Sequence, residues 1–523
     1  MDPASLPDIA LPPIPRTSED QRLSSQPSFM VRRIKLTGNT VFGTQVLHQI
    51  TSRYEGRKIS TEELLALRNE LTLYYIDHGY INSGAVIPDQ EPREGVIEIA
   101  IIEGTLSDVR ISGNTRLKSA YIRDRIDLVP NLPLNINDLK ESIQLLDQNP
   151  LIQRISAELM PGLQRGESVL KVEVSESRPY DFGFSVSNWR SPGVGEIRGE
   201  LQGSHSNLTG RGDALSLQYG VTEGLNDFAV DYAVPINARD LRFGIFLSQS
   251  QSEVIEEPFD AIDITSETES YGLRLEYPFR RTLNGHFLAS ITLERRHSES
   301  LLLGEPHPFS PGSENGESTV TVFRLGQEWL SRRANAVLAA RSRFSFGIDA
   351  FNATINEGDL PDGKFVAWLG QFQWIRRLPK HDIQFVVRSD LQLSADPLLS
   401  LEKFGIGGAT SVRGYRENLL VRDNGWVSSV ETRIPITKLW LGSEQGPAIP
   451  RLALFYDFGW GENIEVATPD PKNISSAGVG LRWSPSRHLH TQLYWGTPLR
   501  NIDTVENDAL QDKGVHFMLN YDF

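Results

Sequence analysis

The sequence of 523 residues predicts a transmembrane β-barrel of about 16 antiparallel strands, preceded by two small α+β domains. Three observations support this fold. A segment near the amino terminus repeats after 75 residues, apolar and polar residues alternate strictly from Arg178 onward, and the connections between alternating segments are short and long in turn. The predicted parts are a Pro-rich linker over residues 1–28, α+β domains over 29–104 and 105–177, and a barrel over 178–523.

The composition excludes several other classes of protein. No apolar run approaches the ~18 residues that a membrane-spanning helix needs. The net charge of -15 disfavours binding to nucleic acid, and the absence of cysteine excludes disulfides, thiol catalysis and Cys-ligated zinc, and suits an oxidising compartment. The sequence also lacks the G-x-S-x-G, H-E-x-x-H and P-loop motifs, and its 10 His are scattered, so we predict no enzyme activity, no cofactor and no metal site.

Residues 1–28 are rich in proline and carry scattered acidic residues. They contain no apolar run of the kind found in a signal peptide, so we expect an extended linker. If the protein is exported, its targeting segment has been removed or lies upstream of Met1. The alternative is a cytosolic protein with an extended tail.

The repeat consists of two strands that each enter a turn, over residues 31–42 and 106–117. Both turns contain the triplet Gly-Asn-Thr, beginning at Gly38 and Gly113. In the first copy, residues 61–78 then carry leucines at the spacing of one buried helix face.

The helices extend the repeat. We expect Ser60 or Thr61 to cap the first helix, with Glu63 reaching back, and Asn137 to cap the second. The buried leucines recur at the same offset, as Leu64 and Leu71 in the first copy and Leu139 and Leu146 in the second. With β-rich runs over 95–103 and 168–174, each copy becomes a β-α-α-β-β unit, which is typical of binding rather than catalysis.

From Arg178 onward, each predicted strand has one apolar face and one polar or small face. In the strand around residues 214–222, Leu217 lies on the apolar face and Gln218 on the polar one. A soluble β-sandwich would show the same alternation, so the pattern alone leaves both folds open.

The connections favour the membrane barrel, because an up-and-down barrel has short turns on one side and long loops on the other. The short connections (207–212, 235–240, 280–281, 332–333, 376–381) lean basic, and the long ones (251–262, 298–317, 395–425, 499–513) lean acidic. At ~20 residues per strand with its connection, the 346 barrel residues hold sixteen or seventeen strands, and an even count gives sixteen. Alternation from Val515 to Phe523 predicts a closing strand that pairs with the first one.

Several motifs resemble those of the two-partner secretion transporters, the hemolysin-secretion (TpsB) type of the outer-membrane polypeptide-transport barrel superfamily. The resemblance covers residues 28–523. The α+β units resemble polypeptide-transport-associated (POTRA) domains, with GYINSGAVIPDQ at 79–90 typical of the first, and NLTGRGD at 207–213 resembles the first periplasmic hairpin. The most specific match is FGIGGATSVRGY at 404–415, which is similar to the family's long sixth loop, and FYDFG at 455–459 resembles the matching strand motif.

The resemblance implies a contact between the tip of loop six (395–425) and Asp457 and Gly459 of the barrel wall. The tip residues are Val412, Arg413, Gly414 and Tyr415. The residues themselves are compatible with this contact, since alternation places Asp457 in the lumen, where a lone carboxylate needs water or a cation. Arg413 can supply a bidentate partner.

Three further charged residues, Glu431, Arg433 and Arg482, are predicted to line the lumen by the same alternation. Simple hydration in the lumen would explain each of them equally well. Members of the family often begin with a helix that plugs the pore. The prolines of residues 1–15 make a poor helix, which argues against a plug of that kind without deciding the question.

The resemblance implies an outer-membrane transporter, not an enzyme, that passes an unfolded partner protein from the periplasm to the cell surface. Its POTRA domains would lie in the periplasm and capture the client by β-augmentation, and the client would thread the lumen after loop six shifts. The implied partners are the client, outer-membrane lipid and the barrel-assembly machinery that inserts the barrel, with no nucleic acid. Two rivals are a factor that inserts other barrels, a class that usually has more POTRA domains, and a passive porin, which has none.

Overall fold

The computed structural model describes residues 9–10, 28–91, 94–436, 449–502 and 509–523. The chain divides into two compact units, Met1–Arg178 and Pro179–Phe523. Of the linker predicted over residues 1–28, only Ile9, Ala10 and Ser28 are described, so the question of a plug helix lies largely outside the described residues. No helix among the described residues is long and apolar enough to cross a membrane.

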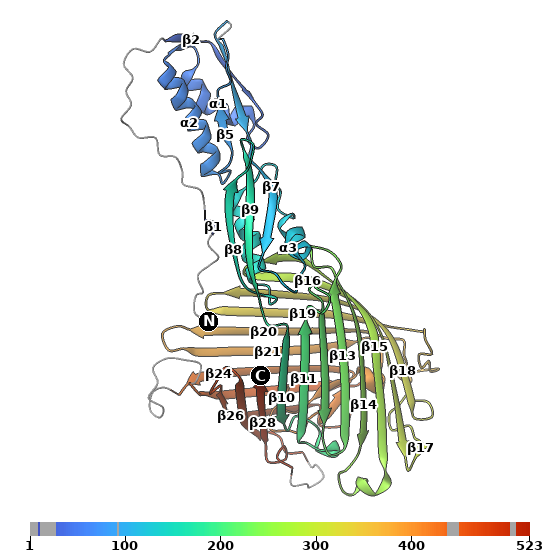
Figure 1. Ribbon diagram of the computed structural model, residues 1–523. Coiled ribbons are helices and arrows are strands. Elements are labelled where there is room, and N and C mark those ends of the chain that lie inside the picture. Colours follow the sequence, from blue (N-terminus) through green and yellow to red (C-terminus); the bar gives the residue numbers. More distant parts are fainter. Residues whose placement is uncertain (1–8, 11–27, 92–93, 437–448, 503–508) are drawn as a thin grey trace. The chain divides into compact units, whose positions relative to one another are not determined.

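The first unit contains two modules with the same topology (Figure 1). The first module comprises β2 (Phe29–Val31), β3 (Arg33–Thr37), α1 (Thr44–Thr51), β4 (Arg57–Ile59), α2 (Thr61–Asp77), β5 (Gly84–Val86) and β6 (Val96–Ile102). The second comprises β7 (Thr105–Ser112), α3 (Ser119–Ile126), α4 (Ile136–Asp147), β8 (Ile152–Pro161) and β9 (Glu167–Glu176). In each, the last strand pairs in parallel with the first long strand and antiparallel with the strand before it, in agreement with the predicted repeat.

The helices pack one face into each module, as the leucine spacing predicted. Leu64, Leu71, Leu139 and Leu146 are all buried. Ser60 and Glu63 form the predicted capping box at the start of α2. The predicted cap of α4 is wrong by two residues, because the side chain that accepts a hydrogen bond from the backbone N–H of Asn137 belongs to Asn135. Both positions are asparagine, so composition alone could not separate them.

The Gly-Asn-Thr turns are held by a glutamate at the end of each module. Gly38 and Gly113 have φ of 80° and 83°, and a Cβ on either would lie 2.3 Å from a carbonyl oxygen of the last strand, so both turns require glycine. Backbone N–H groups of Thr40 and Val41 donate to the Glu103 carboxylate at 2.7 and 2.9 Å. Burial raises the pKa of Glu103, but hydrogen bonds from the Thr40 hydroxyl, from the Val41 and Thr40 backbone and from the Tyr75 hydroxyl together outweigh it and hold the pKa below its ordinary value.

Glu176 repeats this arrangement in the second module. It accepts hydrogen bonds from the backbone N–H groups of Thr115, Arg116 and Leu117 at 2.7, 2.9 and 2.8 Å. Burial raises its pKa, but the backbone hydrogen bonds together lower it by more, so the pKa lies below its ordinary value. Ile9 and Ala10 form β1, which lies in parallel beside Ala157 and Glu158 at the outer edge of β8.

Sixteen long strands of the described residues form a closed antiparallel barrel, as predicted. They are β10 (Tyr180–Ser187), β11 (Arg198–Ser206), β12 (Ala214–Val221), β13 (Leu225–Pro235), β14 (Arg242–Glu253), β15 (Ile264–Thr282), β16 (Gly285–Leu302), β18 (Glu317–Arg333), β19 (Ala336–Ile348), β20 (Val366–Leu378), β21 (Ile383–Ser394), β24 (Asn424–Pro435), β25 (Arg451–Glu462), β26 (Asn473–Trp483), β27 (Leu489–Pro498) and β28 (Val515–Asp522). The short β17 (Glu305–Pro306) pairs with the end of β16.

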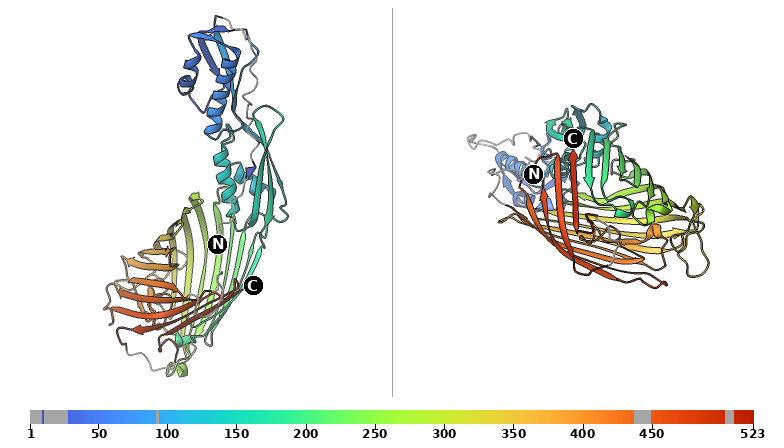
Figure 2. Two further views of the ribbon diagram at one scale, coloured as in Figure 1. Left: turned by 90° about the vertical axis from the view of Figure 1, so that its left-hand side faces the viewer. Right: turned by 90° about the horizontal axis from the view of Figure 1, so that it is seen from below.

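The closing strand pairs with the first strand of the barrel. Residues 183–187 of β10 pair with 518–522 of β28, and the N–H of Phe523 donates to the carbonyl of Phe182 at 2.9 Å. Figure 2 shows the red carboxyl-terminal strands beside the green first strands. The two faces of the wall also follow the prediction, since Leu217 is 42% exposed on the outside and Gln218 lines an internal cavity.

Some predicted connections are strands. The pairs Arg280-Arg281 and Arg332-Arg333 end β15 and β18, and residues 298–302 belong to β16. These strands continue past the apolar band of the wall, so polar sequence there does not mark a turn. Loop six likewise spans 395–423 rather than 395–425, because Asn424 and Gly425 already pair with β25.

Candidate functional site

Loop six packs against the inner face of the barrel wall. It contains a short 3-10 helix, η4 (Ser400–Glu402), and the paired strands β22 (Phe404–Ile406) and β23 (Leu420–Arg422). Ile406 and Val412 of the loop are fully buried in a cluster with Val427 of β24 and Ile474 of β26. The loop is therefore fastened inside the barrel by apolar contacts as well as polar ones.

Arg413 lies at the tip of the loop and binds Asp457 of β25. Its Nε and Nη2 donate to the two carboxylate oxygens at 2.8 and 2.9 Å, and its backbone N–H donates at 3.1 Å. The Arg413 side chain is 7% exposed and that of Asp457 is 0% exposed. The structure thus brings together the loop arginine and the wall carboxylate that were predicted to meet, in the bidentate geometry that makes such pairs strong.

The other predicted lumen residues join the same network. Glu431 accepts a hydrogen bond from Nη1 of Arg413 and one of 2.6 Å from Arg433. Tyr494 donates to Glu431 at 3.2 Å, and Arg482 donates to the Tyr494 hydroxyl at 3.0 Å. Glu431, Arg433 and Arg482 are therefore more than hydrated lumen charges, because hydrogen bonds connect all three to the network around Arg413.

Several residues of this network were not predicted from the sequence. The Arg413 guanidinium lies 3.6 Å from the ring centroid of Phe455 and 4.6 Å from that of Tyr494. Ser429 accepts from Arg413 at 3.1 Å and donates to Asp457 at 2.6 Å. Phe455 could have been noticed in the sequence, because an aromatic residue on the lumen side of β25 breaks the expected pattern of polar residues there.

The rest of the tip is fitted closely to the wall. Gly414 has φ of 89°, and its N–H donates to Nε2 of the buried His516 in β28 at 2.9 Å. The Tyr415 hydroxyl lies 3.0 and 2.9 Å from the backbone carbonyl oxygens of Ser475 and Arg500. A Cβ on Gly459 would lie 2.4 Å from Cγ2 of Ile406, so this wall position favours glycine beside the loop.

These features define the class of protein. The closed barrel has an apolar outer face, a charged lumen and an inward loop, and two POTRA-like modules precede it in the chain. Within the part of the chain that the structure describes, no group of His, Asp and Glu could hold a metal ion. A barrel of this kind is an outer-membrane protein-transport barrel.

Comparison with known proteins gives the family. Residues 166–483 match the haemolysin secretion/activation protein ShlB/FhaC/HecB family, and residues 29–104 match the ShlB-type POTRA domain. The chain belongs to this ShlB/FhaC/HecB family. It is therefore an outer-membrane transporter that secretes a partner protein, and not an enzyme.

Individual relatives are distant but cover most of the chain. The heme/hemopexin transporter protein HuxB of Haemophilus influenzae (strain 86-028NP) is 22% identical over 88% of this chain and 82% of its own length. The hemolysin transporter protein ShlB of Serratia marcescens is 25% identical over 82% of this chain and 78% of its own. The solved structure of CdiB from Escherichia coli shares the fold, with a TM-score of 0.70, 21% identity and coverage of 98% of this chain and 93% of that one.

Proposed function

We propose that loop six closes the lumen of the resting transporter and that the unfolded client passes once this loop has moved. The observation that carries the proposal is Arg413, held by Asp457 and Glu431 on the inner wall with almost no exposed surface. No nucleotide is needed if the client folds outside the cell, because folding there prevents its return. Loop six is then the element that the client must displace.

A disulfide between loop and wall tests this proposal directly, because the chain has no native cysteine. Ile406→Cys combined with Gly459→Cys places one thiol on the loop and the other on the wall, at a site where a Cβ on residue 459 would touch Ile406. We expect oxidation to stop secretion and reduction to restore it, with no effect of oxidant on either single variant. Equal secretion in the oxidised and reduced double variant, with the disulfide verified, would show that the loop need not move.

We also propose that the tandem modules over 29–104 and 105–177, which precede a barrel over 178–523, capture the client as an added β-strand. An edge strand offers unpaired backbone N–H and C=O groups, which bind an extended segment without demanding its sequence. The support is the outer edge of β8, a strand of ten residues that already accepts the short extended segment Ile9–Ala10 in parallel register.

A photo-crosslinking residue placed at the edge tests this mode of capture. We compare Glu158, exposed on β8, with Glu141, exposed on the neighbouring helix α4, in the full chain expressed with the protein encoded beside it. The proposal predicts a crosslink to that protein from position 158 and little from position 141. Crosslinks of equal strength from both positions would argue against capture at this edge.

The barrel-assembly machinery of the cell is the proposed route by which this barrel enters the outer membrane. Until β28 pairs with β10, the backbone N–H and C=O groups at these two edges of the sheet have no partner, which is unfavourable in lipid. Depletion of the machinery should lower the amount of heat-modifiable, folded barrel in the membrane.

A further inference from the structure

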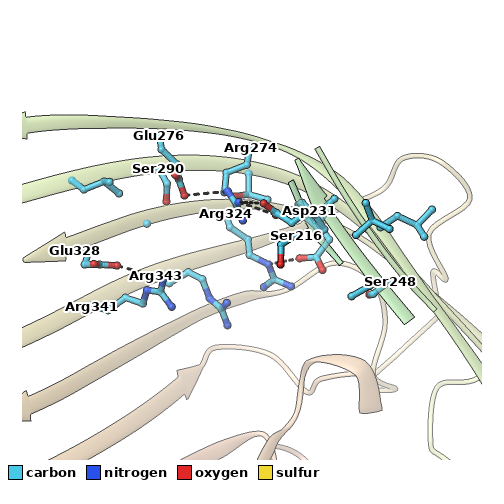
Figure 3. Close-up of a pocket in the computed structure, with 18 of the residues that line it drawn as sticks. Ser216, Asp231, Ser248, Arg274, Glu276, Ser290, Arg324, Glu328, Arg341 and Arg343 are labelled. Atoms are coloured by element: carbon cyan, nitrogen blue, oxygen red, sulfur yellow. Dashed lines mark hydrogen bonds and ion pairs between the residues drawn. The ribbon is translucent and has the colours of Figure 1, made fainter. Parts of the chain in front are cut away.

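A second part of the lumen wall carries an internal polar cavity of about 610 Å³. Strands β12 to β19 line it, and Figure 3 shows its charged side chains projecting from neighbouring strands. Four of these are arginines, at positions 274, 324, 341 and 343. None of them belongs to the network around Arg413.

Three of these arginines are paired with carboxylates of the wall itself. Arg274 lies 2.9 Å from Asp231, Arg341 lies 3.5 Å from Glu328, and Arg324 lies 2.9 Å from Glu294. Arg343 forms no hydrogen bond or ion pair with any residue that the structure describes, and its Nε is buried. The lining thus holds four arginines and four carboxylates, but Arg274 pairs with both Asp231 and Glu276, which leaves Arg343 without a carboxylate in direct contact among the described residues.

Loop six supplies a further carboxylate to this wall. Glu402, the last residue of η4, is 7% exposed and accepts hydrogen bonds from Nη2 and Nη1 of Arg324 at 2.8 and 3.0 Å. Nη1 of Arg296 in β16 donates to the same carboxylate at 3.0 Å. The base of the loop is thus bound to the wall by one acidic side chain held between two arginines.

Removal of Glu402 would change the charge balance of this wall. Arg296 and Arg324 would then share Glu294 as their carboxylate partner among the described residues, and Arg324 is almost fully buried. A buried cation that loses its partner is unfavourable, and a guanidinium in this setting binds a carboxylate in bidentate fashion. The adjoining cavity gives a second carboxylate a way in.

We propose that Arg296, Arg324 and Arg343 form a carboxylate-binding site, which Glu402 fills at rest and which an acidic side chain of the client fills after loop six moves. When the loop is released, the carboxylate of the client then replaces that of Glu402 in this arginine site. The buried arginines are therefore not left without a partner. The role of the client rests on the proposed function. The existence of the site does not, since it depends only on these wall residues and Glu402.

Block of ion current by a short acidic peptide tests the site without any client. The full chain is reconstituted in planar bilayers, and hexaglutamate is added to the wild type, to Glu402→Gln and to Glu402→Gln with Arg324→Gln. We expect hexaglutamate to block Glu402→Gln at about tenfold lower concentration than the wild type, as the loss of a competing charged hydrogen bond predicts. The double variant should return to the wild-type value, and hexalysine should not discriminate among the three.

A matched control separates a specific site from a general rise in positive charge. Glu328→Gln removes one negative charge from the same wall, where its partner Arg341 is largely exposed. The proposal is overturned if Glu402→Gln is blocked no more strongly than the wild type or Glu328→Gln, or if the block survives Arg324→Gln. Each variant must first show the heat-modifiable migration of a folded barrel, and Arg343→Gln replaces Arg324→Gln if that variant does not fold. Because no client is present, failure of the proposed secretion mechanism would leave this result unchanged.

Discussion

Among the described residues, loop six makes two charged contacts of opposite polarity with strands of the barrel wall, while Arg416 pairs with Glu256 and Asp512 in other connections. At the tip, the loop contributes the cation Arg413 and the wall contributes Asp457 and Glu431. At the base, the loop contributes the carboxylate of Glu402 and the wall contributes Arg324 and Arg296. Each end of the loop therefore supplies a counter-charge to the part of the wall that faces it. Because the two ends carry opposite charges, these contacts favour one direction of the loop in the lumen as well as one position.

The two contacts also differ in the interactions that accompany their ion pairs. The tip adds aromatic packing on Phe455, a backbone hydrogen bond from Gly414 and the burial of Val412 to its ion pairs. The base adds a hydrogen bond of 3.0 Å from Gln392 to the Glu402 carbonyl, and Leu398 and Leu399 are buried there in a cluster with Val320 and Val322. We infer that the tip is the more sensitive of the two, because Asp457 has Arg413 as its ion-pair partner, whereas Arg324 keeps Glu294 when Glu402 is lost.

The largest effect is expected from Arg413→Ala. This substitution leaves the buried Asp457 without its cation and Glu431 with Arg433 alone, a loss of about 3 to 5 kcal/mol for a buried pair, while the strand ladder is untouched. Secretion should fall to background with the barrel still inserted. Secreted client is measured relative to folded barrel, and Arg413→Lys, which keeps the charge but not the bidentate geometry, should secrete only partly. Wild-type secretion by Arg413→Ala would contradict the claim that the tip contact matters more than the base contact.

Asp457→Ala should reproduce that loss, because it removes the bidentate partner of Arg413 and leaves this buried arginine with Glu431 alone. If the two residues act as one unit, the double variant should secrete no less than either single variant. Residual secretion from a sensitised reporter client can measure all three. Losses that simply multiply would mean that Arg413 and Asp457 act through different steps.

The sequence predicted the parts of this arrangement that rest on periodicity. Alternation alone placed Asp457, Glu431 and Arg482 on the lumen side, and the count of residues per strand led to sixteen strands. Pairing of Arg413 with Asp457 needed the resemblance to a family, since nothing in strand periodicity shows where the tip of a long loop comes to rest.

The base contact could not be predicted, for a related reason. Glu402 lies outside any strand, and its partners Arg296 and Arg324 are separated from it by 106 and 78 residues. Alternation places the arginines in the lumen but gives no register between a loop and a wall. The misplaced cap at Asn137 is a smaller case, in which two asparagines that are two residues apart carry the same chemical signal.

A smaller effect is expected at the base. Glu402→Ala should reduce secretion about threefold to tenfold, since one charged hydrogen-bonded contact is lost while the tip remains bound. Glu402→Gln should lie between this variant and the wild type, because its amide oxygen can still accept from Arg324. The measurement is again secreted client relative to folded barrel. Complete loss of secretion in Glu402→Ala would make the base as critical as the tip.

The smallest effect is expected from Lys403→Ala, beside the base contact. The Lys403 ammonium lies 3.0 Å from Oδ1 of the buried Asp423, but that carboxylate also accepts backbone N–H groups of Leu398 and Ile464 at 3.1 and 2.9 Å. These two donors remain after the substitution, so the free energy of unfolding in detergent should fall by only about 1 kcal/mol. Asp423→Ala removes the acceptor from all three donors and should cost several times more. If the two variants destabilise the barrel equally, the Lys403 ammonium and not the two backbone N–H groups provides most of the stabilisation of Asp423. The base of loop six would then depend on a second ion pair besides that of Glu402.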